Sequence, residues 1–174
     1  MITYIDKNDN TISQNSYEKF ILNLQIHQIK CPGCGHFGCM RIHGYYTRKV
    51  KTKGGSFILR VMRLVCTGCG QTHALLPSSL VPYSQPSLEC QVLVIEISEA
   101  GGDLSSVCSE FPDVDENNIK SMIKKYRKCW KQKLSSEAVR FRPLEILTRK
   151  CFAYFSRKFL QIHRTVNSLF FITT

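Results

Sequence analysis

The sequence predicts an α+β fold in which a small metal-ligating β unit precedes a set of helices. Two Cys-x-x-Cys-Gly segments enclose a stretch that is rich in aromatic and β-branched residues. A glycine pair interrupts this stretch near its middle, as expected for a β-hairpin. Further along, apolar residues recur at helical spacing between residues 119 and 134.

The two cysteine pairs, Cys31/Cys34 and Cys66/Cys69, have the spacing of one tetrahedral metal site. A two-residue spacer lets one tight turn present two thiolates to the same ion, and zinc takes four such ligands. The glycine after each pair can adopt positive φ, which closes the turn and directs backbone N–H groups at the sulfurs. Residues 31–82 are therefore predicted to form a zinc ribbon that binds Zn2+ through these four cysteines.

The cysteines are also compatible with two other kinds of site. A thioredoxin-like redox pair needs a βαβ context that is absent here, and it does not account for two pairs. A rubredoxin-like iron site uses the same ligands, and thiolate geometry alone does not exclude iron. Residues 19–88 contain no Asp or Glu, which argues against such an electron carrier and favours zinc. Four residues near the pairs are predicted to be packing or surface residues, because the paired cysteines already fill the shell: Cys39, His36, His43 and His73.

The hairpin is predicted from residues 41–51 and 56–65, which are joined through Lys53-Gly54-Gly55. Residues 1–30 are predicted to be an N-terminal segment with an edge strand within 1–13 and a short helix over 16–22. After the ribbon, Leu75-Leu76-Pro77 and Pro82–Pro86 are predicted to break regular structure and lead into a second unit.

Residues 83–136 are predicted to form a helix-turn-helix unit. Ser87 caps its first helix, Pro112 ends its short second helix, and Asp115 lies in the first turn of the third, where the helix dipole favours a carboxylate. The apolar face of the third helix consists of Ile119, Met122, Ile123, Tyr126, Trp130 and Leu134. In DNA-binding proteins the last helix of this motif enters the major groove. The alternative is a solvated basic face without a binding role.

The formal net charge of +11 is divided into blocks along the chain. Residues 31–88 hold seven basic and no acidic side chains, residues 89–119 hold eight acidic and no basic ones, and residues 120–174 hold 14 basic and two acidic ones. This segregation predicts two cationic surfaces separated by an acidic one, and cationic surfaces are typical of proteins that bind double-stranded DNA.

The candidate DNA contacts are the basic side chains of the hairpin and the polar or basic side chains of the third helix. They are Arg41, Arg48, Lys49, Lys51, Lys53, Arg60, Arg63, Asn117, Asn118, Lys120, Lys124, Arg127 and Lys131. Asparagine near a helix start can pair with adenine, whereas cations further along the helix meet phosphates.

Residues 137–174 are predicted to contain a C-terminal helix with Pro143 as its first residue. It is followed by an apolar tail at 169–172, which is expected to pack against another surface. Aromatic and basic residues are interleaved in this helix. Such a stripe more often serves core packing or a protein contact than base stacking.

Nine cysteines without a disulfide framework indicate a reducing compartment. The sequence has no apolar run of about 18 residues and no charged-then-apolar leader, so we expect a cytoplasmic protein without a membrane partner.

The segment from Cys31-Pro-Gly-Cys-Gly to Arg63-Leu-Val-Cys66-Thr-Gly-Cys-Gly-Gln-Thr-His73-Ala-Leu-Leu-Pro77 resembles an uncharacterised bacterial zinc-ribbon family, a domain of unknown function. Over about residues 30–134 the chain is also similar to the zinc-ribbon plus helix-turn-helix heads of insertion-sequence transposases. The resemblance implies binding to terminal repeats of a mobile element, which in those enzymes a following RNase H-like domain then cuts. Here Glu137 and Glu145 are the only acidic side chains past Lys120, so a two-metal carboxylate cluster is missing.

These observations predict a non-catalytic, zinc-containing DNA-binding protein associated with a mobile element or its regulation. One alternative is a zinc-ribbon protein–protein interaction module, whose ribbon holds a protein partner and whose C-terminal aromatic helix is an interface for a transposase or another protein. Another is a truncated transposase remnant. A metal-dependent nuclease would lack its carboxylates.

Overall fold

The computed structural model describes residues 1–5, 12–162 and 169–172. The chain divides into two compact units. The ribbon unit consists of Met1–Arg48, Ile58–Ser78 and Thr165–Thr174, and the helical unit consists of Lys49–Phe57 and Ser79–Arg164.

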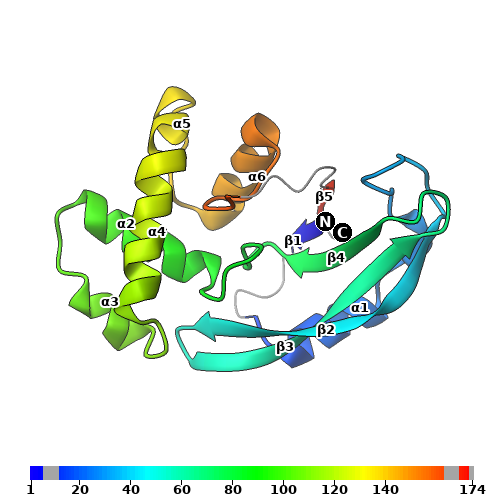
Figure 1. Cartoon of the computed structure of the whole chain (residues 1–174), viewed down its shortest axis with the longest axis horizontal. Helices are drawn as coiled ribbons and strands as arrows, with labels where there is room; N and C mark the ends of the chain where they lie inside the picture. Colours follow the sequence, from blue (N-terminus) through cyan, green and yellow to red (C-terminus); the bar gives the residue numbers. More distant parts are fainter. Residues whose placement is uncertain (6–11, 163–168, 173–174) are drawn as a thin grey trace. The chain divides into compact units, whose positions relative to one another are not determined.

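The strands form a five-stranded sheet with the order β2-β3-β4-β1-β5 (Figure 1). The strands are β1 (Ile2–Ile5), β2 (Met40–Thr52), β3 (Gly55–Cys66), β4 (Thr72–Pro77) and β5 (Leu169–Ile172). β3 and β4 are antiparallel, whereas β1 is parallel to both of its neighbours, β4 and β5. The predicted hairpin is present as β2 and β3.

The N-terminal strand was predicted to lie at an edge, and this is wrong. β1 lies between β4 and β5, and its residues Ile2, Thr3 and Tyr4 are all buried. A strand that is buried on both faces belongs inside a sheet, where its backbone finds partners on both sides.

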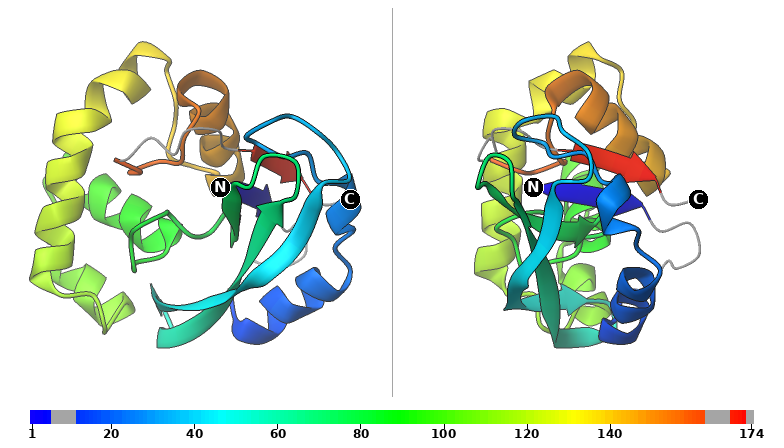
Figure 2. Two further views of the ribbon diagram at one scale, coloured as in Figure 1. Left: turned by 45° about the vertical axis from the view of Figure 1, so that its right-hand side comes forward. Right: turned by 90° about the vertical axis from the view of Figure 1, so that its right-hand side faces the viewer.

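The segment 75–77 was predicted to break regular structure, and this is also wrong. It forms the end of β4, where Leu75 pairs with Ile2 and Pro77 with Tyr4. Proline is tolerated because it is the last residue of the strand. The apolar tail does dock, as predicted, because β5 pairs in parallel with β1, from Ile2 with Leu169 to Ile5 with Ile172 (Figure 2).

The predicted short helix is α1 (Gln14–Leu22), which begins after a capping box formed by Ser13 and Ser16. A single-turn 3-10 helix, η1 (Ile26–Gln28), follows.

The side chains of α1 continue the hydrogen bonding of β3 beyond the end of its ladder with β4. The β3–β4 ladder extends from Val65, which pairs with Thr72, to Arg63, which pairs with Ala74. The buried Tyr17 hydroxyl then accepts from the backbone N–H of Met62 at 3.0 Å and donates to the carbonyl of Leu75 at 2.8 Å. No local pattern in the sequence predicts this bridge.

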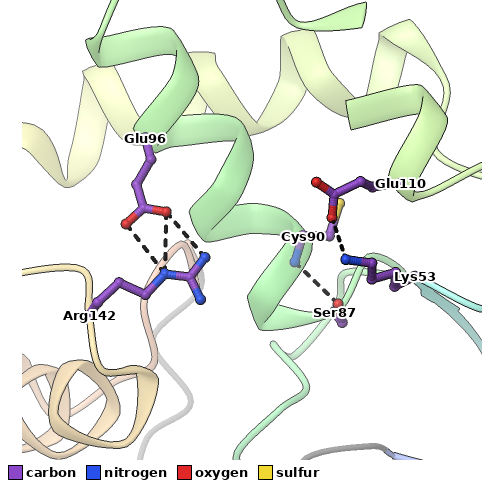
Figure 3. A network of polar contacts seen from close by, with 6 residues as sticks. All are labelled: Lys53, Ser87, Cys90, Glu96, Glu110 and Arg142. Atoms are coloured by element: carbon purple, nitrogen blue, oxygen red, sulfur yellow. Dashed lines mark hydrogen bonds and ion pairs between the residues drawn. The ribbon is translucent and has the colours of Figure 1, made fainter. Parts of the chain in front are cut away.

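The helical unit contains α2 (Leu88–Glu99), α3 (Ser105–Glu110), α4 (Glu116–Cys129), α5 (Lys131–Ser136) and α6 (Leu144–Phe155). The predicted cap at Ser87 is confirmed, and Asp115, expected in the first turn of the third helix, occupies its N-cap position. The Ser87 hydroxyl accepts from the N–H of Cys90 at 3.3 Å (Figure 3), and the Asp115 carboxylate accepts from the N–H of Asn118 at 2.8 Å. Within the described residues, no helix combines the length and apolar composition required to cross a membrane.

The helical pattern from 119 to 134 does not form one continuous helix. The chain departs from helical geometry at Trp130, with φ −124° and ψ −34°, and α5 begins at the next residue. Trp130 is buried and packs edge-on against Phe155 and Phe159. Pro143, predicted as the first residue of the last helix, instead occupies its N-cap position.

The tip of the hairpin belongs to the helical unit. Lys51 is buried, and its ammonium donates to the side-chain oxygen of Asn118 at 2.7 Å and lies 3.4 Å from the Asp115 carboxylate. Lys53 forms an ion pair of 2.9 Å with Glu110 (Figure 3).

A second ion pair of the helical unit joins Arg142 to Glu96 of α2 at 3.2 Å (Figure 3). It fixes the segment that precedes α6 against α2.

We expect the Tyr17→Phe substitution to lower the free energy of unfolding by about 2 kcal/mol, because it leaves a buried N–H and a buried carbonyl without their shared partner. Denaturant titration measures this loss. Tyr45→Phe in the same unit is the matched control, because the Tyr45 ring is 42% exposed and the loss should stay within about 0.5 kcal/mol. Equal losses in both variants would contradict the bridging role of the Tyr17 hydroxyl.

Candidate metal centre

The structure brings together the four cysteines that the sequence singled out. Cys31 and Cys34 lie in the turn before β2, Cys66 is the last residue of β3, and Cys69 lies in the turn that leads to β4. Their four sulfur atoms all lie within 4.8 Å of one another. The four residues can therefore act together as ligands of one metal ion.

The sulfur positions fit a tetrahedral ion. The Sγ atoms of Cys31 and Cys69 are 3.7 Å apart, and those of Cys34 and Cys66 are 3.6 Å apart. These distances are far longer than a disulfide bond of about 2.05 Å. A regular tetrahedron with zinc–sulfur bonds of about 2.3 Å has edges of about 3.8 Å. The donor set thus has the size and the chemistry of a tetrathiolate metal site.

Both cysteine pairs lie in turns of the same geometry. The N–H of Gly35 donates to the carbonyl of Cys31 at 2.9 Å, and the N–H of Gly70 donates to the carbonyl of Cys66 at 2.8 Å. Gly35 has φ 79° and Gly70 has φ 71°, as the sequence predicted. The N–H of Gly33 also points at the Cys31 sulfur, at 3.3 Å.

Hydrogen bonding among the thiols moves their pKa values apart. Burial alone would raise the pKa of Cys66, but hydrogen bonding with the neighbouring thiols and the Cys69 backbone lowers it to about 6. For Cys69, a hydrogen bond from the Gln71 backbone lowers the pKa, but burial and the neighbouring thiols outweigh it and raise the pKa to about 12. Without a cation the cluster therefore retains protons at neutral pH, and metal binding must displace them.

The four other candidate ligands are not part of the four-cysteine cluster. His73 is buried, and its Nε2 lies 3.6 Å from the Cys31 sulfur. Burial and the N-terminal ammonium lower the pKa of His73 to about 4, so it is neutral at pH 7. Cys39 donates to the carbonyl of His36 at 3.2 Å, and His36 and His43 are exposed.

The predicted DNA contacts are distributed over both units. The ribbon unit holds Arg41, Arg48, Arg60 and Arg63, the hairpin tip holds Lys49, Lys51 and Lys53, α4 holds Asn117, Asn118, Lys120, Lys124 and Arg127, and α5 holds Lys131.

Within the ribbon unit, the predicted arginines differ in their surroundings. Arg60 is exposed and its guanidinium lies 4.2 Å from the centroid of the Tyr45 ring. Arg41 donates to backbone carbonyls, and Arg63 donates to the Thr72 hydroxyl at 3.0 Å. Arg48 is partly buried. Tyr45 was not among the predicted site residues, because its contact with Arg60 depends on strand register.

Within the helical unit, several predicted contacts already have acidic or amide partners. Lys120 pairs with Glu116 at 2.8 Å, and Lys131 pairs with Glu99 at 2.8 Å. Lys51 and Lys53 are engaged as described above. By contrast, Lys124 and Arg127 are exposed on α4 without an ion pair to a described carboxylate.

We expect purified protein to carry about one metal ion per chain, because four thiolates complete one tetrahedral shell. The double variant Cys31→Ser, Cys66→Ser should lose the ion and the ribbon structure, since a structural zinc site contributes on the order of 10 kcal/mol to folding. Elemental analysis measures the content and distinguishes zinc from iron, and circular dichroism reports the structure.

Cys39→Ser is the matched control, because it removes a neighbouring thiol that is not one of the four clustered ligands. It should retain the metal. Metal-free wild-type protein with an intact ribbon would rule out the site.

Comparison with known proteins gives a match to part of the chain. No curated protein and no solved structure matches the chain. A family model does match, over residues 31–110, and its description is "Domain of unknown function (DUF6431)". The matched segment begins at Cys31 and ends with the last residue of α3, so it includes all four cysteines, the hairpin, β4 and α2. Residues 31–110 thus match a domain of unknown function, and they include the four-cysteine cluster that can hold a metal ion.

Proposed function

We propose that the chain is a non-catalytic protein that binds double-stranded DNA and contains one structural zinc ion. The observation that carries the proposal is the unbalanced positive charge of the ribbon unit. Among its described residues, Glu18 is the one carboxylate side chain, and Arg41, Arg60 and Arg63 form no ion pair with a described carboxylate. Arginines that lack internal counter-ions are suited to phosphate groups.

The helical unit supports the proposal through the distribution of its ion pairs. Five of the eight carboxylates between residues 89 and 119 pair with cations of the same unit, namely Glu96, Glu99, Glu110, Asp115 and Glu116. This pairing offsets much of the acidic block that separates the two basic parts of the sequence. Lys124 and Arg127 are then exposed on α4 without an ion pair to any carboxylate of the described residues.

We assign α2, α3 and α4 to a helix-turn-helix unit within this proposal. The order is a helix, a short helix and a longer cationic helix, and α4 is the one that approaches DNA. The Lys124 and Arg127 side chains would contact phosphates and fix the position of the protein rather than select a sequence.

The proposed role of the zinc ion is structural. Four cysteine ligands complete a tetrahedral shell and leave no open position for water or substrate, whereas catalytic zinc sites keep one open. Zinc is preferred to iron because residues 19–88 lack the acidic side chains expected of a small electron carrier.

The similarity to transposase heads extends the proposal to biological context. It supports an association with a mobile element or its regulation, in the cytoplasm, as a complete regulator or as a remnant of a transposase. A transposase or another protein is the proposed second partner, and it would bind the exposed Ile146 and Tyr154 of α6.

The alternative function, a module that binds only proteins, receives less support from the C-terminal aromatic residues. Phe155 and Phe159 pack on Trp130, so they contribute to the core of the helical unit rather than to a surface. This agrees with the sequence-based preference for packing over base stacking.

We expect affinity for duplex DNA to fall steeply as salt increases, because each neutralised phosphate releases condensed counterions. Fluorescence anisotropy with a labelled duplex at several salt concentrations measures the slope of log K against log salt. No binding, or an affinity that does not change with salt, would favour the protein-binding alternative.

We expect the double variant Lys124→Ala, Arg127→Ala to bind all duplexes more weakly and with a shallower salt slope, by about one to two charges. Gln132→Ala, an exposed neutral position on α5, is the matched control and should bind like wild type. An unchanged salt slope in the double variant would exclude α4 from the interface.

A further inference from the structure

We propose that the β2–β3 hairpin, and not the start of helix α4, reads the base sequence in the major groove. This inference rests on the proposed DNA-binding function and assigns readout within it. It reverses the simplest expectation from the sequence, in which the asparagines at the start of α4 contact bases.

The start of α4 is occupied by internal contacts. The side-chain oxygen of Asn118 accepts from Lys51 at 2.7 Å, and Lys51 is only 7% exposed. Reading adenine requires both the oxygen and the amino group of an asparagine. Asn118 would have to release a buried ammonium group to do so, which leaves that charge without its nearest amide partner.

The same end of α4 also carries negative charge. Asp115 caps the helix and Glu116 follows it, so two carboxylates lie in the first turn. A hydrogen bond from the backbone N–H of Asn118 holds the pKa of Asp115 below its usual range, so this group remains ionised at neutral pH. Lys120 is paired with Glu116 and therefore offsets one of these charges instead of contacting DNA. Lys51 offsets the other carboxylate, so the start of α4 offers no net positive charge to phosphates.

The hairpin, unlike the start of α4, presents an exposed row of polar and aromatic side chains. Every second residue over part of β2 has an exposed side chain that is polar or aromatic: Arg41, His43, Tyr45 and Thr47. Residues two apart on a strand share one face of the sheet, so these form a continuous polar and aromatic stripe. A two-stranded β-ribbon fits the major groove, which is about 12 Å wide.

Arg60 on β3 is the side chain best placed to recognise a base. Its guanidinium lies over the Tyr45 ring at 4.2 Å, a contact that restricts the plane of the group while its edge N–H donors remain available. Its backbone N–H donates to the Gln14 side chain of α1 at 2.8 Å, so the strand itself is fixed at this residue. A restricted, exposed arginine is suited to bidentate hydrogen bonding with O6 and N7 of guanine.

The experiment begins with selection of a preferred duplex from a random pool by wild-type protein, followed by titration of each variant against that duplex and a scrambled one. Arg60→Lys keeps the charge but removes the planar fork. We expect it to lower affinity for the preferred duplex by about tenfold or more and to change affinity for the scrambled duplex by less than about twofold. Tyr45→Ala should act in the same direction, whereas Tyr45→Phe keeps the ring and should retain the preference.

Asn117→Ala is the matched control at the start of α4, because Asn117 is exposed and its loss does not leave Lys51 unpaired. The ratio of the two affinities should be unchanged. Methylation of guanine N7 supplies an independent readout, because one guanine whose methylation blocks wild-type binding should no longer do so for Arg60→Lys.

The remaining outcomes each contradict a stated part of the proposal. If wild type binds no duplex, the proposed DNA-binding function fails. If wild type binds duplexes without preference, binds single strands better than duplexes, or loses preference through Asn117→Ala, DNA contact stands but readout by the hairpin is overturned. If Arg60→Lys lowers affinity equally for both duplexes, Arg60 contacts phosphate only, and base recognition by this residue is overturned.

Discussion

The convergence of four thiols is the constraint on which the ribbon unit depends. Cys31 and Cys34 precede β2 and Cys66 ends β3, so one cluster joins the base of the hairpin to the turn that leads into β4. The sulfurs of Cys31 and Cys69 are 3.7 Å apart and those of Cys34 and Cys66 are 3.6 Å apart, which suits a single tetrahedral ion. With its base held in this way, a hairpin of more than ten residues in each strand can present side chains in a defined register.

The hairpin needs a second support where β4 no longer pairs with β3. Helix α1 supplies it through Gln14, which accepts from the N–H of Arg60, and Tyr17, which accepts from that of Met62. These two bonds satisfy alternate N–H groups along one edge of β3, as another strand would. The residue proposed to read bases is thus held by its own backbone as well as by its ring contact, which links the stability of α1 to the surface that we propose for DNA.

Local patterns made part of this structure predictable. The cysteine spacing, the glycine turns and the caps at Ser87 and Asp115 each depend on a few neighbouring residues, and the structure contains all of them. The errors concern distant partners. Nothing near residues 75–77 shows that β1 will pair with them, and the helical period at 119–134 does not reveal that Trp130 packs against α6. Likewise, Lys51 and Asn118 were predicted as separate DNA contacts, and nothing in the sequence shows that their side chains hydrogen-bond to each other.

The parallel pairing of β1 with β5 has a consequence for the order of folding. β1 precedes the described helices in the chain, whereas its partner β5 follows them and is synthesised only after the helical unit. Until then one edge of β1 exposes unpaired backbone groups, and closing so large a loop is entropically slow. Helices α2 to α5 contact one another over short sequence separations and can form earlier during translation, so the strand pair that completes the sheet would be the last to form and the most exposed to chaperones and proteases.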